Sequence, residues 1–385
     1  MEHSEALHRY FSHAKPAMLE SIRTLVEMES PSTDIHRLDR CADHLRSVFA
    51  PVVDRAPIIP VRDGGNHLRC ELQAKREILP PILVLTHFDT VWPVGTLERM
   101  PFRETPNGRA YGPGIFDMKS SLAMMEHIFG AFRELDIDPG RNVVLLATAD
   151  EEIGSATSRQ LIEDEARQVN CVLVLEAPLP GGVLKTARKG SRHIDVHIKG
   201  IPAHAGIEIE KGVSAIEEAA HQILAIQAMT DLETGLTVNA GVHQGGTRAN
   251  VVAPHADIQI DVRAWRDADL RDAENQLRNL RPRLQGTSID VVSARSRPPL
   301  EETATKDVFA KARTIAASLD MELVAGRTGG GSDGNLTGAL GVPTLDGLGV
   351  PGAGAHADHE HIETDQLVSR TWLLSELILG LAVGD

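Results

Sequence analysis

The sequence predicts an α/β protein with a mostly parallel β-sheet flanked by helices and a smaller, inserted α+β domain. Short apolar runs end abruptly in polar residues at 82–86, 143–149 and 171–175, which is typical of buried strands in a parallel sheet. Segments with helical periodicity separate these runs, as in a sheet with helices on both faces. After Gly190 the strands alternate between polar and apolar residues, which indicates an antiparallel sheet with one solvated face.

The chain length of 385 residues favours two domains. We expect the larger domain to comprise 1–189 and 301–385, and the inserted domain to comprise 190–300.

Local patterns place the individual elements. Residues 4–28 have apolar positions at helical spacing, and Pro16 predicts a break or a second helix start within this segment. Ser120 and Ser121 are suited to cap the helix that follows them. The other elements expected in the larger domain are helices at 38–49, 157–168, 305–319 and 372–383, and strands near 52–62, 68–74, 82–86, 143–149, 171–175 and before Leu345. Those expected in the inserted domain are strands at 193–199 and 257–263 and helices at 213–229 and 267–284.

Charge and composition argue against several classes of function. With 39 Lys and Arg against 54 Asp and Glu, the formal net charge is −15, so a nucleic-acid partner is not expected. The N-terminus lacks the basic region and apolar core of an export signal, and the apolar tract 372–383 is too short to span a membrane. The three widely spaced cysteines favour neither a disulfide framework nor a thiolate metal site. We therefore expect a cytoplasmic protein without a membrane partner.

Acidic and imidazole side chains follow several of the expected strands and loops. They are His87, Asp117, Glu151, Glu152, Glu176 and His356. Open α/β sheets bind ligands at the carboxyl ends of their strands, so we expect these side chains to meet at one edge. Carboxylates mixed with imidazoles suit Zn²⁺, or Co²⁺ or Mn²⁺ in its place. This set exceeds the needs of one ion and predicts two metals that share a carboxylate.

The adjacent carboxylates Glu151 and Glu152 need not point in the same direction. One can bind a metal while the other acts as a general base. Each residue alone also has an ordinary interpretation, since His87 could be a core histidine and Asp117 a helix cap. Their occurrence together favours the metal site.

Five motifs occur in order along nearly the whole chain. They are His87-Phe-Asp-Thr-Val, Gly112-Pro-Gly-Ile-Phe-Asp-Met-Lys, Ala149-Asp-Glu-Glu-Ile-Gly-Ser, His204-Ala-Gly and His356-x-x-x-Glu-His-Ile. Together they resemble the M20 family of co-catalytic zinc peptidases and deacylases. The segments that begin at Tyr111 and Arg327 are most similar to its glutamate carboxypeptidase (carboxypeptidase G2-like) branch.

This resemblance implies two zinc ions per subunit. His87 and Glu176 would hold one ion, Glu152 and His356 the other, and Asp117 would bridge the two. Two further histidines lie close to His356 in the sequence, and the family pattern favours His356 as the ligand.

The resemblance also implies the roles of residues that bind no metal. Asp89 would orient His87, and Glu151 would be the general base that moves a proton from water to the leaving nitrogen. The inserted domain would be a lid and a homodimerisation module. His204 would stabilise the oxyanion from the same or the partner subunit.

Three further residues would contact the substrate. Asn250 and Arg263 resemble residues that reach towards it, and Arg327 resembles an arginine that clamps its terminal carboxylate. A guanidinium binds a carboxylate through two hydrogen bonds, which suits this role.

The sequence thus predicts a metallo-carboxypeptidase that cleaves an amide bond and releases a glutamate-like amino acid with a free carboxylate. One alternative is an N-acyl-amino-acid deacylase of the acetylornithine or succinyl-diaminopimelate type. A second is a binding homologue without catalysis, which the presence of Glu151 beside a full ligand set disfavours. A third is an aminopeptidase, which the insert and Arg327 disfavour.

Overall fold

The structure is a computed structural model that describes residues 2–381. The chain forms two compact units. Unit 1 comprises Met1–Thr186, Glu302–Arg327 and Ser332–Asp385, and unit 2 comprises Ala187–Glu301 and Thr328–Gly331. The insert expected from the sequence, 190–300, does not include the short segment Thr328–Gly331.

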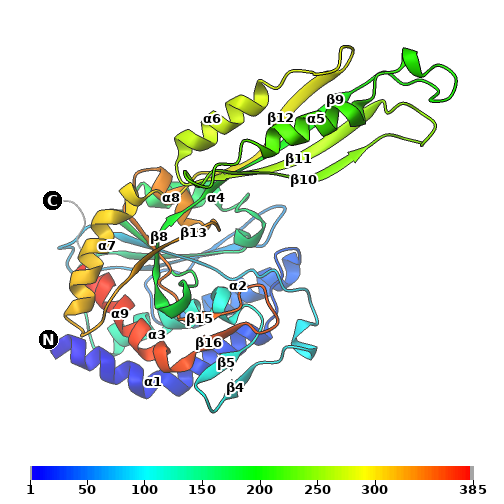
Figure 1. The fold of residues 1–385 in the computed structure, drawn as a ribbon. Helices are drawn as coiled ribbons and strands as arrows, with labels where there is room; N and C mark the ends of the chain where they lie inside the picture. The colour runs from blue at the N-terminus through cyan, green and yellow to red at the C-terminus, as the bar shows by residue number, and fades with distance from the viewer. Residues whose placement is uncertain (1, 382–385) are drawn as a thin grey trace. The chain divides into compact units, whose positions relative to one another are not determined.

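An eight-stranded sheet forms the centre of unit 1 (Figure 1). Its strands lie in the order β1 (Ile58–Ile59), β2 (His67–Leu72), β6 (Val143–Thr148), β3 (Ile82–His87), β7 (Cys171–Val174), β14 (Thr344–Asp346), β8 (Leu184–Arg188) and β13 (Ala325–Thr328). β6, β3, β7 and β14 run parallel, whereas β1, β2 and β8 pair antiparallel with their neighbours. The predicted parallel sheet with flanking helices is confirmed, with antiparallel strands towards its margins.

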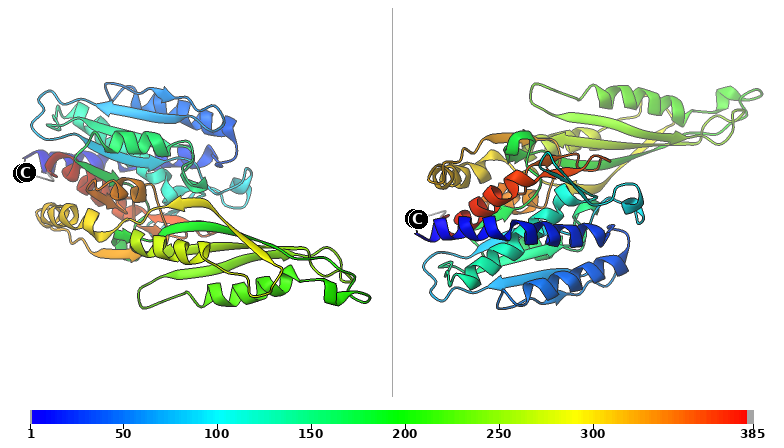
Figure 2. Two further views of the ribbon diagram at one scale, coloured as in Figure 1. Left: turned by 90° about the horizontal axis from the view of Figure 1, so that it is seen from above. Right: turned by 90° about the horizontal axis from the view of Figure 1, so that it is seen from below.

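Helices cover both faces of this sheet, which explains why its central strands are apolar throughout. Along β3, Ile82 and Val84 belong to one hydrophobic core, and Leu83 and Leu85 belong to another. The first core receives α1 (Glu2–Glu27), α2 (Ile35–Phe49), α3 (Ser120–Glu134), α7 (Glu302–Ala317) and α9 (Leu367–Gly380). The second receives α4 (Arg159–Ala166) and α8 (Gly334–Ala339). Figure 2 shows α1 and α9, the first and last helices, lying side by side.

A small antiparallel sheet in unit 1 brings two loops together. Its strand order is β15 (Gly352–Ala353), β16 (His361–Glu363), β5 (Arg109–Tyr111) and β4 (Arg103–Thr105). His361 pairs with Tyr111, so the loop 354–360 between β15 and β16 lies next to the segment 112–119 that follows β5.

Three local expectations differ from the structure. α1 continues through Pro16, so the predicted break is wrong; Phe11 and Met18 on either side are fully buried, and their packing holds the helix together despite the missing backbone donor. The serine cap of α3 is also wrong, because Ser121 Oγ donates to the carbonyl of Leu175 at 2.6 Å. Of the strand expected near 52–62, only Ile58–Ile59 forms a regular strand. The end of the expected terminal helix, 382–383, lies outside the described residues.

Unit 2 is a four-stranded antiparallel sheet with two helices on one face (Figure 1). The strands lie in the order β10 (Thr237–Gly245), β11 (His255–Ala264), β9 (Gly190–Lys199) and β12 (Ser288–Arg297), and the helices are α5 (Ala215–Gln227) and α6 (Asp267–Arg278). Along β9, buried Val196 and Ile198 alternate with exposed His193 and His197. This arrangement accounts for the alternation in the sequence.

Within the described residues, 2–381, no helix combines the length and the apolar composition needed to cross a membrane.

Candidate metal centre

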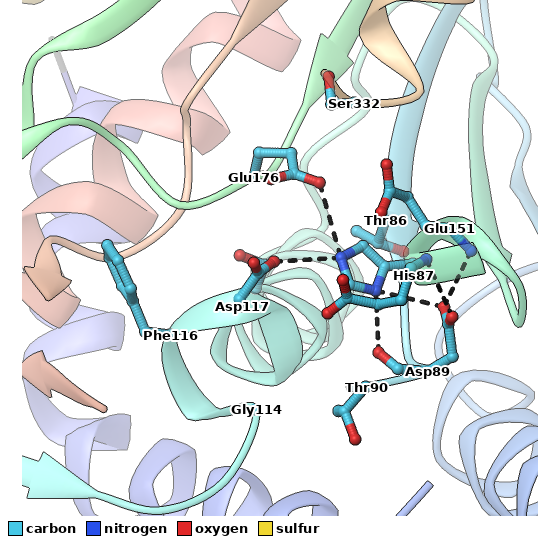
Figure 3. A network of polar contacts seen from close by, with 12 residues as sticks. Thr86, His87, Asp89, Thr90, Gly114, Phe116, Asp117, Glu151, Glu176 and Ser332 are labelled. Atoms are coloured by element: carbon cyan, nitrogen blue, oxygen red, sulfur yellow. Dashed lines mark hydrogen bonds and ion pairs between the residues drawn. The ribbon is translucent and has the colours of Figure 1, made fainter. Parts of the chain in front are cut away.

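Two groups of potential metal ligands share the carboxylate of Asp117. Figure 3 shows the first group, in which Asp117 and Glu176 face His87. Asp117 Oδ1 lies 3.2 Å from His87 Nε2, and Asp117 Oδ2 lies 3.5 Å from His356 Nε2. Glu176 Oε1 completes the first group at 3.6 Å from His87 Nε2. Glu152 Oε2 completes the second at 3.2 Å from His356 Nε2. The structure thus brings together the five residues that the sequence singled out as ligands.

The parallel strands explain how three of these residues meet. His87 is the last residue of β3, Glu152 lies in the turn Glu151–Ile153 that follows β6, and Glu176 follows β7. These three strands are adjacent and parallel, so their carboxyl ends lie at one edge of the sheet.

The other two ligand candidates come from the loops beside the small sheet. Asp117 lies in the turn Ile115–Lys119, where the peptide bond between Asp117 and Met118 is cis. His356 lies in the β15–β16 loop with a left-handed backbone (φ 61°). Such a conformation is unfavourable for a residue other than glycine and is common at functional sites.

Asp89 orients His87 through two contacts. The ring Nδ1 of His87 lies 3.0 Å from the carbonyl oxygen of Asp89 and 3.3 Å from its carboxylate Oδ1. A carbonyl oxygen can only accept, so Nδ1 carries a proton, and in a neutral ring the lone pair would be on Nε2, the nitrogen that faces Asp117 and Glu176. This is the tautomer that metal ligation through Nε2 needs.

The electrostatics of the site show an excess of negative charge. Burial lowers the pKa of His87, but the surrounding carboxylates of Asp117, Asp89 and Glu176 outweigh burial and hold it well above its ordinary value. Hydrogen bonds to Asp117 and Glu152 raise the pKa of His356 to about 10. Burial and the neighbouring Asp117 charge raise the pKa of Glu152. The carboxylates therefore favour cations between them.

The donor set fits two divalent metal ions. Three carboxylates and two imidazoles, without a thiolate, match the ligands that Zn²⁺, Co²⁺ and Mn²⁺ bind. In addition, Oε1 of Glu152 is buried and has no hydrogen-bond partner within residues 2–381. An unpaired buried carboxylate oxygen is costly unless a cation binds it.

The two adjacent glutamates separate into different positions. Glu152 belongs to the second ligand group, whereas Glu151 belongs to neither group. Asp89 fixes the backbone of both, because the amides of Glu151 and Glu152 donate to its Oδ1 and Oδ2 at 3.2 and 3.1 Å. Figure 3 shows the contact between Glu151 and Asp89.

Sequence reasoning did not single out two residues that support this centre. Ser32 Oγ donates to Asp89 Oδ2 at 2.7 Å. Glu360 accepts hydrogen bonds from the backbone of the turn that carries Asp117. Glu360 is the glutamate of the motif His356-x-x-x-Glu-His-Ile, and this motif is the signal that could have drawn attention to it.

Within unit 2, the expected substrate residues do not all lie together, and Nη1 of Arg263 donates to the carbonyl of Gly329, two residues after Arg327, at 2.9 Å. Arg327 is in β13 of unit 1, where its Nε donates to Glu302 Oε1 at 2.6 Å. His204 and Asn250 lie close together in unit 2, because the amide of Ala205 donates to the carbonyl of Asn250 at 3.0 Å. Arg263 is near the end of β11 and pairs with Asp261 at 3.1 Å.

Comparisons of the sequence and the fold with known proteins agree on one family of peptidases and related hydrolases. A sequence profile of peptidase family M20/M25/M40 matches residues 83–380. The chain is 29% identical to carboxypeptidase G2 from Pseudomonas sp. (strain RS-16) over 379 residues, which cover 96% of this chain and 90% of that protein. It is 25% identical to succinyl-diaminopimelate desuccinylase from Acidovorax ebreus (strain TPSY), with 72% and 74% covered. Its fold is similar to that of Bacillus subtilis YxeP, described as a dinuclear metal binding peptidase, with a TM-score of 0.71, 16% identity and coverage of 96% and 98%.

Proposed function

This chain belongs to peptidase family M20/M25/M40, and we propose that it is a two-metal hydrolase that cleaves an amide bond to release an amino acid with a free carboxylate. The observation that carries the proposal is the carboxylate of Asp117, whose two oxygens each face a histidine. The similarity to carboxypeptidase G2 supports a glutamate-like leaving group.

We assign His87 and Glu176 to one ion, Glu152 and His356 to the other, and Asp117 to both. Zn²⁺ is the expected metal, and Co²⁺ or Mn²⁺ would suit the same ligands. When bound, such ions polarise the substrate carbonyl and acidify the attacking water.

Glu151 is proposed as the general base. It follows a ligand strand, its backbone is fixed by Asp89, and it is not needed as a ligand in either group. In this role Glu151 accepts the proton of the attacking water and passes it to the leaving nitrogen. His204 is proposed to stabilise the negative charge that develops on the carbonyl oxygen.

Arg327 is proposed to bind the free carboxylate of the substrate. In the structure the guanidinium of Arg327 already donates to a carboxylate, that of Glu302, so this position is suited to carboxylate binding. Both side chains are about half exposed, and exposed ion pairs contribute little stability. A substrate carboxylate could therefore replace Glu302 at small cost. Asn250 and Arg263 remain proposed substrate contacts.

We further propose that the protein is a homodimer formed through unit 2. On and beyond α5, the apolar side chains of Leu224 and Leu232 are 72% and 78% exposed. β10 is an edge strand of the same sheet; the side chains of Thr230 and Gln227 bind its backbone at Val238 and Ala240, and the remainder of the edge is proposed to pair with a second copy. Exposed apolar surface beside this edge supports association with a second copy.

The spacing within unit 2 supports a contribution of His204 to the partner's site. His204 and Asn250 lie near His255, at the beginning of β11, whereas Arg263 lies near its end. Eight residues of strand separate these points by roughly 26 Å. One small substrate therefore cannot contact both ends of β11 in the same unit.

A cytoplasmic location is supported by the three buried free cysteines.

A substrate screen tests the proposed function. Metal-free protein would be reloaded with Zn²⁺ or Co²⁺ and assayed for amino-acid release from acyl-glutamates, dipeptides, acetylornithine and succinyl-diaminopimelate. We expect metal-dependent release of glutamate from an acyl-glutamate. Preference for a substrate with a free amino terminus over one with a free carboxylate would contradict the proposal.

The second candidate is an N-acyl-amino-acid deacylase, which the similarity to succinyl-diaminopimelate desuccinylase favours. The same metal site would serve this reaction, because both reactions hydrolyse an amide. Release of succinate or acetate, with no cleavage of acyl-glutamates, would establish this alternative.

A further inference from the structure

Glu360 is fully buried, and its carboxylate points at backbone amides. Oε1 accepts hydrogen bonds from the amides of Phe116 and Asp117 at 2.9 and 3.0 Å. Oε2 accepts from the amide of Gly114 at 2.9 Å and from the indole Nε1 of Trp92 at 2.7 Å. N–H donors thus occupy both lone pairs of each oxygen, which fixes the orientation of the carboxylate.

These bonds join two loops that are distant in the sequence. Three of the donors belong to the turn that carries Asp117, whereas Glu360 belongs to the β15–β16 loop that carries His356. The backbone adds a further link, because the amide of Gly112 donates to the carbonyl oxygen of Glu360 at 3.4 Å. Glu360 therefore fixes one ligand loop against the other.

The loop that carries His356 is folded tightly against Glu360. Gly354 has a left-handed φ of 83°, and a side chain there would come within 3.0 Å of the Glu360 backbone. The amide of Ala357 donates to the carbonyl of Gly354, and the amide of Glu360 donates to the carbonyl of Ala357, both at 2.9 Å. These consecutive turns leave His356 little freedom to move independently of Glu360.

We propose that Glu360 is a positioning residue that sets the separation of Asp117 and His356, and that tight metal binding between Asp117, Glu152 and His356 requires its carboxylate. The inference rests on the two-metal site of the proposed function and is independent of the substrate. The other ligand group depends less on Glu360, because His87 and Glu176 are held at strand ends.

Glu360→Gln tests this proposal, because it keeps the shape of the side chain and removes acceptor capacity. In either orientation, the amide nitrogen of glutamine would face two N–H donors. In zinc titrations of the metal-free protein, we expect the ion between Asp117, Glu152 and His356 to bind about 10- to 100-fold less tightly, with a smaller change for the other ion. Trp92→Phe removes one of the four donors and should have a smaller effect.

Glu363→Gln is the matched control. Glu363 lies in β16, three residues from Glu360, and its carboxylate accepts from Arg109 Nε at 3.1 Å. It makes no contact with the turn 114–117 in the described part of the chain. We expect wild-type affinity for both ions in this variant. Wild-type affinity for both ions in Glu360→Gln would overturn the proposal.

Hydrogen exchange provides a measurement that does not depend on the variant. In the metal-free wild-type protein, the amides of Gly114, Phe116 and Asp117 should exchange slowly, because Glu360 binds them without metal. Exchange as fast as in an unstructured chain would contradict the proposal even if Glu360→Gln does not fold. Failure of the wild-type protein to bind zinc would instead contradict the proposed function.

Discussion

Asp89 joins three segments that are far apart in the chain. Its carboxylate accepts hydrogen bonds from Ser32 and from the amides of Glu151 and Glu152, and it lies beside Nδ1 of His87. A carboxylate next to a ligating histidine usually fixes the ring. Here the same carboxylate also fixes the turn that holds the proposed base and one ligand.

Asp89→Asn is therefore expected to weaken both metal binding and turnover. Asparagine can accept at only one atom, so at least one amide of the turn 151–152 loses its partner. We expect a 10- to 100-fold loss, roughly, in zinc affinity or kcat. Zinc titration and steady-state kinetics measure the two quantities. Ser32→Ala, which removes one donor and leaves Asp89 charged, should lose less than Asp89→Asn, and an equal loss would argue against this account.

Glu151→Gln separates catalysis from metal binding. Because Glu151 belongs to neither ligand group, we expect the variant to keep its metal while kcat falls by about 10² to 10⁴. Metal content can be measured by emission spectrometry alongside the kinetics. The adjacent change, Glu152→Gln, should instead reduce metal content. Unaltered turnover in Glu151→Gln would rule out its role as the base.

The clustering of the candidate ligands could be predicted because histidines and carboxylates placed directly after apolar strands form a recognisable pattern. The family resemblance was needed to propose Glu151 as the base and Glu152 as the ligand, since the two adjacent glutamates have the same side-chain chemistry. Ser32 and Glu360 could not be predicted as supports, because both act through contacts that form only in the folded chain. Glu360 stands in the motif that begins at His356, but residue types alone do not show that its side chain binds backbone amides.

At the scale of elements, α3 begins directly after the turn that carries Asp117 and contains a histidine poorly suited to carry charge. Nε2 of His127 is buried and has no hydrogen-bond partner among the described residues. Burial lowers the pKa of His127 from 6.5 to about 4. The folded protein therefore binds this proton less readily than the unfolded chain does.

The contribution of His127 to the stability of the protein should consequently fall in mild acid. The contribution of His127 is complete above its unfolded pKa of 6.5 and is lost as the pH falls from 6.5 towards 4. At pH 5 the expected loss from this group is about 2 kcal/mol. His127→Leu should show a smaller drop in unfolding free energy between pH 7 and pH 5, as measured by denaturant titration of the metal-free protein. An equal drop in both proteins would exclude His127 as a cause.

The elements that were predicted well are those that are buried on both faces. The central strands are covered on both faces, so their apolar runs were unambiguous. Pro16 shows the opposite case, because burial of Phe11 and Met18 outweighs a local helix-breaking preference. The region 52–62 has strand-like composition but forms only the two-residue strand Ile58–Ile59. Tertiary packing, which local patterns do not contain, decides such segments.

At the scale of the whole molecule, the length of β11 separates the substrate residues proposed in unit 2. His204 and Asn250 lie near the beginning of this strand, whereas Arg263 lies near its end. This spacing leads us to expect that a complete site combines residues of two subunits. A homodimer with two-fold symmetry would exchange these residues reciprocally.

Mixing two inactive variants tests this expectation. In a mixed dimer of His204→Ala with Glu151→Gln, one site would have both an intact base and an intact histidine from the partner. Random mixing should restore about a quarter of wild-type activity if His204 acts in trans. Each variant alone, treated identically, serves as the control. No recovery from mixed dimers, with dimerisation verified by light scattering, would place His204 in the same subunit as the base it serves.

The main segment of unit 2, Ala187–Glu301, begins and ends in paired backbone. Arg188 and Leu300 exchange hydrogen bonds at 3.0 and 3.1 Å, immediately beside the boundaries of the unit. Because the two ends of this inserted segment lie next to each other, the segment can be lengthened, shortened or exchanged without moving the strands of unit 1 that it connects. Evolution could thus vary the insert, in which we propose substrate contacts, while the candidate ligands of unit 1 stayed in place.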